Sequence, residues 1–150
     1  MPSSYTCLHY HLIFSTKDRR ALITGDLPTR LYDYLGGIIA REKGRLLAAG
    51  GAADHVHLLV SLSANRALAD VLRVVKTNSS KWVHETFPAS RDFGWQDGYA
   101  AFAVSVSTVA QVKRYIAAQE KHHRRRSFQD EFVAFLERHG IEYDPRYLWT

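Results

Sequence analysis

The stretch RLLAAGGAADHVHLLVSL, residues 45–62, decides the fold of this chain. Residues 45–49 predict a short strand, and the largely apolar residues 54–62 predict a second one. The two glycines between them, Gly50 and Gly51, predict the turn of a β-hairpin. A hairpin at this place in the chain indicates an antiparallel sheet, since tight turns join antiparallel strands.

Strand-like and helix-like patterns alternate on both sides of this hairpin. Thr108 and Gln111 form a capping-box signature, and Gly44 stands where a helix stop belongs. The expected elements, in chain order, are a strand over 5–15, a helix over 27–44, the two hairpin strands, a helix over 65–86, a loop over 88–98, a strand over 99–105, a helix from 108 to about 125 and a short helix over 127–140. The order β-α-β-β-α-β-α predicts an α+β fold of the ferredoxin-like, split βαβ type, with an antiparallel sheet and helices on one face.

Length and composition limit the class of protein. A chain of 150 residues fits one domain, residues 1–150. Its 46% hydrophobic content excludes disordered and collagen-like classes, and the lone Cys7 excludes a disulfide-stapled scaffold and favours a reducing compartment. No stretch approaches the roughly 18 apolar residues of a membrane span, and no signal peptide is evident. We therefore expect a cytoplasmic protein that does not associate with a membrane.

The charge of the chain favours a polyanionic partner only mildly. Twenty Lys and Arg residues against fifteen Asp and Glu residues give a formal net charge of +5. Many proteins with this balance bind no nucleic acid, so charge alone leaves that question open.

His55-Val56-His57 is the sharpest local feature. The period of two in a strand puts both imidazoles on one face and turns Val56 and Leu58 to the other. Two ligands on one rigid strand make half a metal site. The plainer alternative is a pair of hydrogen-bonded histidines on a half-exposed strand, and His9-Tyr10-His11 has the same spacing. Spacing alone does not choose between these alternatives.

Tyr115 and Gln119 offer a nucleophile and a third ligand. They lie four residues apart and share one helix face, whereas the apolar stripe of the same helix consists of Val109, Val112 and Ile116. We expect Tyr115 to be displayed away from the core. Taken alone, each of the two residues is equally compatible with an ordinary surface position on an amphipathic helix.

The ordered combination of several motifs resembles a known family. His55-Val56-His57 has the HUH form, two histidines around a bulky hydrophobic residue. The other motifs are FGWQDGYAAFAVS over 93–105, Tyr115-Ile116-x-x-Gln119 followed by His122-His123, and HGIEYDPRYLW over 139–149. Together they resemble the single-tyrosine HUH transposases of small insertion sequences and their repeat-associated relatives, over nearly the whole chain.

This resemblance implies an active site and a reaction. His55, His57 and the carbonyl oxygen of Gln119 would bind Mg²⁺ or Mn²⁺, a mixed nitrogen and oxygen site unlike a closed structural zinc site. Tyr115, on a C-terminal helix, would attack single-stranded DNA and form a 5′-phosphotyrosine. The family recognises hairpins at the ends of its elements and rejoins strands without ATP.

Candidates for DNA contact lie outside this site. We expect phosphate contacts from a basic cluster and base stacking from Trp95, although basic residues at a helix end can also be simple dipole partners and Trp95 can be a core residue. The candidate DNA-binding residues are Arg124, Arg125, Arg126, Lys113 and Trp95. Candidates for assisting deprotonation of the tyrosine are Lys113, His122 and His123.

Two further functions compete with a transposase. One is a domesticated repeat-associated HUH nuclease; the other is a non-catalytic, ferredoxin-like nucleic-acid-binding domain, although the aromatic RNA-binding pattern of that class is missing. Excision must process two DNA ends, so we also expect a C₂ homodimer, in which the Tyr115 helix of one protomer could complete the site of its partner.

Overall fold

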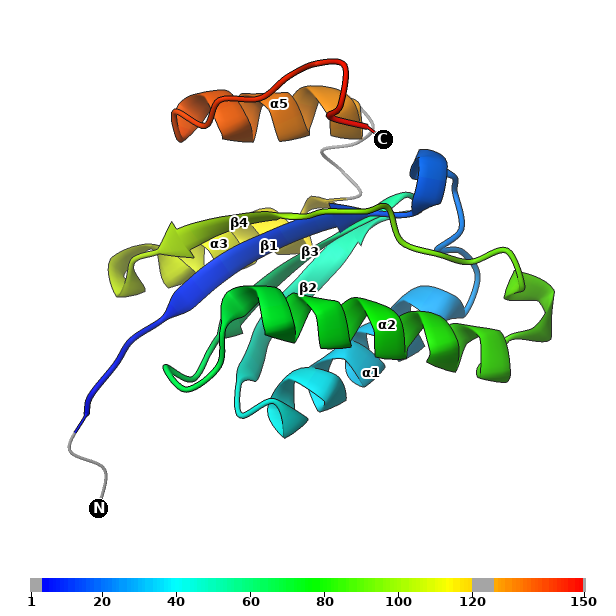
Figure 1. Ribbon diagram of the computed structural model, residues 1–150, viewed down its shortest axis with the longest axis horizontal. Helices are drawn as coiled ribbons and strands as arrows, with labels where there is room; N and C mark the ends of the chain where they lie inside the picture. The colour runs from blue at the N-terminus through cyan, green and yellow to red at the C-terminus, as the bar shows by residue number, and fades with distance from the viewer. Residues whose placement is uncertain (1–3, 120–125, 150) are drawn as a thin grey trace.

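The computed structural model describes residues 4–119 and 126–149 (Figure 1). The sheet in this part of the chain has four antiparallel strands in the order β2-β3-β1-β4. The strands are β1 (His9–Ser15), β2 (Arg45–Ala52), β3 (His55–Ser61) and β4 (Ala100–Val104). The helices are α1 (Leu27–Arg41), α2 (Leu68–Thr86), α3 (Val109–Ala117) and α5 (Phe128–Arg138). Three short 3₁₀ turns, Lys17–Arg19, Pro88–Ser90 and Val106–Thr108, complete them.

The predicted α+β fold with an antiparallel sheet is confirmed. The expectation that the helices lie on one face needs correction, because α1 and α2 pack against one face of the sheet and α3 and α5 lie over the other (Figure 1). Strand β1 shows why two layers form. Leu12 and Phe14 join the core under α1 and α2, whereas Ile13 joins a second cluster with Phe128 and Leu136 of α5. Alternation along one buried strand thus supplies apolar side chains to both faces.

The predicted hairpin exists, but its turn lies elsewhere. Strand β2 continues through both glycines, with Gly50 opposite His57, and the turn is formed by Ala53 and Asp54. The prediction of a Gly50-Gly51 turn was wrong. A Cβ atom on Gly50 would lie 2.5 Å from the carbonyl oxygen of Ile116, so glycine at this place permits the close approach of α3 to the sheet.

Two predicted helix ends also need correction. Thr108 makes no side-chain capping hydrogen bond to α3, because its hydroxyl donates to the carbonyl of Ser105 at 3.0 Å. Helix α3 ends at Ala117, and Ala118 has non-helical backbone angles, so the expected continuous helix is interrupted there. The remainder of that prediction, over 120–125, lies outside the described residues.

The close approach of Ile116 to Gly50 leads to a prediction about stability. We expect Gly50→Ala to lower the free energy of unfolding by about 1–3 kcal/mol, because the added methyl group overpacks the contact with Ile116. Gly37→Ala is the matched control. Apart from its chain neighbours and the backbone of its own helix, no atom lies within 4 Å of a Cβ placed there, in the middle of α1, so this change should raise stability by about 0.5–1 kcal/mol. Chemical denaturation measures both, and an equal effect of the two changes would contradict the explanation.

Among the described residues, no helix combines the length and the apolar character that crossing a bilayer requires.

Candidate active site beneath helix α5

The two histidines of β3 point to the face that α3 and α5 cover. The side chains of His55 and His57 are both 0% exposed, and Val56 and Leu58 lie in the core on the opposite face. The predicted sharing of one face by the two imidazoles is therefore confirmed. Because the sheet places both rings rigidly, any third group that reaches them defines the site.

Asp54 fixes the orientation of the His55 ring. Nδ1 of His55 lies 2.7 Å from the carboxylate of Asp54, which only accepts hydrogen bonds, so Nδ1 carries a proton. Nε2 of the same ring lies 3.2 Å from the oxygen Oε1 of Gln119. With its proton on Nδ1, a neutral His55 ring would offer the lone pair of Nε2 to a metal ion on the side where Gln119 lies.

His11 supports the ring of His57 from β1. Nε2 of His11 lies 2.7 Å from Nδ1 of His57. Burial, followed by the charge of His57, lowers the pKa of His11 to about 3, so the His11 ring is neutral. A His57 ring that binds a metal through Nε2 carries its proton on Nδ1 and donates it to His11. His9, by contrast, stands at the start of β1 and contacts Cys7.

Glu131 is a member of the site that no sequence motif predicted. It comes from α5, is 2% exposed, and its Oε1 lies 2.9 Å from Nε2 of His57 and 3.7 Å from Nε2 of His55. The ligand atoms of these three side chains lie within 4.8 Å of one another, close enough to hold one metal ion. A signal was present, because Glu131 lies three residues after Phe128 and four before Phe135, on the apolar stripe of its helix.

Tyr115 and Gln119 complete the cluster from the other side. The hydroxyl of Tyr115 donates to Oε2 of Glu131, and the amide of Gln119 donates to the same oxygen at 3.2 Å. Burial, and then the hydrogen bond and charge of Glu131, raise the pKa of Tyr115 above its ordinary value. The expectation that Tyr115 is displayed away from the core needs correction, because α5 covers it and its ring meets Phe135 edge-on, with centroids 5.7 Å apart.

The donor set fits a divalent metal ion of the magnesium or manganese type. Two imidazole nitrogens, one amide oxygen and one carboxylate oxygen converge, and no thiolate is present among the described residues of the site. Mixed nitrogen and oxygen donors suit Mn²⁺ and Mg²⁺, whereas closed structural zinc sites favour cysteine and histidine.

The candidate DNA-binding residues fall into three groups. Lys113 on α3 and Arg126 before α5 are exposed and available for phosphate contact. Trp95 packs into the core instead. Its indole N–H donates to Ser79 at 2.9 Å and its ring meets Phe14 edge-on, so the expectation of base stacking by this residue is not supported. Arg124, Arg125, His122 and His123 lie outside the described residues.

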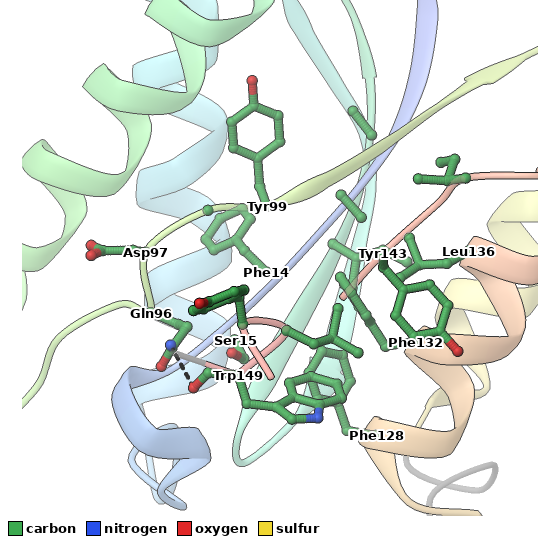
Figure 2. Close-up of a pocket in the computed structure, with 17 residues that line it drawn as sticks. Phe14, Ser15, Gln96, Asp97, Tyr99, Phe128, Phe132, Leu136, Tyr143 and Trp149 are labelled. Atoms are coloured by element: carbon green, nitrogen blue, oxygen red, sulfur yellow. Dashed lines mark hydrogen bonds between the residues drawn. The ribbon is translucent and has the colours of Figure 1, made fainter. Parts of the chain in front are cut away.

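A cavity of about 340 Å³ lies beside the site and shows how α5 is held (Figure 2). Phe128 and Phe132 of α5 and Trp149 of the C-terminal tail line this cavity and pack against one another, and Gln96 donates to the carbonyl of Trp149 at 2.9 Å. Phe128 also stacks on His55, with ring centroids 4.2 Å apart. Helix α5 therefore packs against the C-terminal tail, forms part of the cavity wall and contacts the active site.

Comparisons with known proteins give the same class as the fold and site. The family model "Transposase IS200 like" matches residues 4–119. The ISDra2 transposase TnpA of Deinococcus radiodurans is 31% identical over 117 residues, which cover 75% of this chain and 84% of that protein. The transposase for insertion sequence element IS200 of Salmonella typhimurium is 28% identical over 116 residues, 73% of this chain and 75% of that protein. This chain belongs to the IS200-like transposase family.

Solved structures share the fold. A crystal structure of a candidate transposase from Deinococcus radiodurans has a TM-score of 0.64 and 27% identity, covering 79% of this chain and 95% of that one. A repeat-associated tyrosine transposase bound to a REP hairpin has a TM-score of 0.60 and 13% identity, covering 82% of this chain and 73% of that one. The family match ends at Gln119, so α5 and Glu131 lie beyond it.

Proposed function

We propose that this chain is a metal-dependent single-strand DNA transposase, which cleaves and rejoins DNA through a 5′-phosphotyrosine at hairpin-flanked element ends. One observation carries the proposal: Tyr115, Gln119 and the buried pair His55 and His57 converge on one point. A nucleophile and a set of metal ligands on rigid elements are the parts that phosphoryl transfer needs. The membership in the transposase family supports this assignment.

The reaction exchanges one phosphate ester for another. The Tyr115 oxygen forms a bond to the phosphorus, and the bond from phosphorus to the preceding 3′-oxygen breaks. The proton that leaves Tyr115 balances the proton that the departing 3′-hydroxyl gains. A DNA 3′-hydroxyl reverses the step and restores the phosphodiester, so strand joining needs no nucleotide cofactor.

His55, His57 and Gln119 would hold the metal ion. When bound, Mg²⁺ or Mn²⁺ supplies Lewis-acid stabilisation of the charge on the non-bridging phosphate oxygens. Asp54 and His11 fix the two imidazole rings through Nδ1, which keeps both Nε2 atoms directed towards the same place.

A hairpin is the proposed recognition element in the DNA. The likeness to a transposase bound to a REP hairpin supports this part of the proposal. Exposed Lys113 and Arg126, together with Arg124 and Arg125, would contact phosphates beside the site. A DNA substrate and the lone Cys7 favour the cytoplasm as the place of action.

A covalent adduct is the direct test of the proposed activity. The protein is incubated with labelled single-stranded oligonucleotides from the flanks of its gene, with Mn²⁺ or Mg²⁺, and run on a denaturing gel. We expect a labelled band that resists denaturant and disappears with a chelator. Addition of a second strand with a free 3′-hydroxyl separates the two catalytic alternatives, because a transposase joins it and a domesticated nuclease only cleaves. A non-catalytic binding domain gives no adduct.

We also propose a homodimer with one active site for each DNA end. In this structure Tyr115 lies beside the His57 ring of its own chain, with centroids 5.9 Å apart, so completion of a partner's site requires the tyrosine helix to relocate. We expect sedimentation at micromolar concentration to show a dimer, and a stable monomer would contradict this.

Mixing two inactive variants locates the tyrosine in the active assembly. If each chain builds its own site, a mixture of Tyr115→Phe and His57→Ala proteins leaves every site with a defect, and we expect no cleavage. Restored cleavage after proven subunit exchange would show that the tyrosine helix serves the partner.

A further inference from the structure

Helix α5 covers the two histidines and Gln119 of the active site. His55 and His57 are 0% exposed and Gln119 is 1% exposed. The Phe128 ring stacks on His55, and Phe135 meets His11 edge-on with centroids 5.3 Å apart. A phosphate in a DNA strand cannot reach the imidazoles while α5 is in this position. The described structure is therefore a closed state of the site.

Glu131 makes the two contacts that a reacting phosphate would make. One oxygen, Oε1, lies 2.9 Å from Nε2 of His57, among the ligand atoms. The other oxygen, Oε2, accepts the hydroxyl of Tyr115. In the proposed reaction, a non-bridging phosphate oxygen must lie at the ligand set, and the phosphorus must lie about 3–3.5 Å from the tyrosine oxygen. The carboxylate thus bridges the nucleophile and the ligand set as a phosphodiester would.

We infer that the Glu131 carboxylate occupies the position of the scissile phosphate, and that α5 and single-stranded DNA compete for this face of the sheet. The inference rests on the proposed function. Two anions at this distance repel each other in a buried site, so the carboxylate and the phosphate cannot both be seated. The apolar face that α5 leaves, around Ile13 and Phe102, then becomes available to the flanking nucleotides.

The position of α5 in the chain agrees with an exchangeable cover. The family match covers residues 4–119, which include every proposed ligand and the nucleophile, whereas Glu131 lies beyond it. The helix is held by its own apolar contacts, chiefly Phe128 and Leu136, and by packing against Trp149. If α5 moves away, His55, His57, Tyr115 and Gln119 stay in place, because all four belong to the part of the chain that the family model matches.

The test compares Glu131→Gln with Asp130→Asn. Both changes remove one negative charge from the first turn of α5, but Asp130 is exposed and outside the cluster. Affinity for the hairpin oligonucleotide is measured by fluorescence anisotropy in a chelator, and adduct formation is measured with Mn²⁺. We expect Glu131→Gln to bind and react at least about tenfold better, the size of one lost charged hydrogen bond. Asp130→Asn should resemble the unchanged protein.

A second variant and a second measurement guard against misfolding. Leu136→Ala weakens the docking of α5 without touching the carboxylate, since Leu136 is buried in the apolar cluster, and it should also bind DNA more tightly. Circular dichroism checks that each variant is folded. Hydrogen exchange of the unchanged protein should show that amides 128–138 lose protection when the oligonucleotide binds.

The possible results separate the two proposals. Slower adduct formation by Glu131→Gln would overturn the inference and make Glu131 a participant in the reaction. Unchanged protection of α5 at saturating oligonucleotide would overturn it as well. If no variant forms an adduct but Glu131→Gln binds more tightly and α5 is released, the proposed chemistry fails while the competition stands. If no variant binds the oligonucleotide, both fail.

Discussion

Replacement of Tyr115 by Phe is expected to abolish the covalent protein–DNA adduct while hairpin binding stays the same or becomes slightly tighter. The change removes only the nucleophilic oxygen and keeps the ring packed between His57 and Phe135. Phe has no oxygen that could bond to phosphorus, so no adduct can form, and cleavage should fall by about 10⁶-fold, as it does when another covalent enzyme loses its nucleophile. The measurement is the denaturing gel described above.

Tyr5 supplies the control for this experiment. Its side chain is 92% exposed, and it lies before β1, so Tyr5→Phe should leave adduct formation unchanged. A persistent adduct in the Tyr115→Phe protein would show that another group is the nucleophile. Loss of hairpin binding in the same variant would indicate damage to the fold rather than to the chemistry.

Replacement of His57 by Ala is expected to remove both cleavage and high-affinity Mn²⁺ binding. His57 offers a direct ligand atom, so its loss leaves the metal site incomplete. His11→Ala should have a smaller effect, because His11 only orients the His57 ring; loss of such a supporting group lowers metal affinity by about 10-fold to 100-fold. Calorimetric titration with Mn²⁺ measures affinity independently of DNA cleavage.

The two His-x-His motifs provide their own comparison. His55→Ala should resemble His57→Ala, whereas His9→Ala should resemble the unchanged protein, because His9 contacts Cys7 at the start of β1 and not the cluster. An equal or greater loss on changing only His9 and His11 would overturn the assignment of the metal pair to β3.

The fold was largely predictable because periodicity is a local property. Alternation along β1 and β3 and the apolar stripes of α1, α2 and α5 are visible in the residue order. The turn at Gly50-Gly51 was not predictable in the same way. Glycine is typical both of turns and of close backbone contacts, and only the packing of Ile116 against β2 shows which role applies here.

The site was predictable to the extent that its residues form motifs. The His55-Val56-His57 spacing placed two imidazoles on one face, and the four-residue spacing of Tyr115 and Gln119 placed them together. Glu131 belongs to no such motif, since it comes 74 positions after His57. Its carboxylate reaches the cluster only because α5 folds back over the sheet, which is a result of apolar contacts between distant segments.

The sequence by itself therefore determined the α+β fold, the face of β3 that carries chemistry and the pairing of Tyr115 with Gln119. The tertiary structure decided that His11 and not His9 supports His57, that Trp95 packs against the core and that Glu131 closes the site. The physical reason is range: hydrogen-bonding periodicity acts over a few residues, whereas burial and the meeting of charges depend on which distant surfaces pack together.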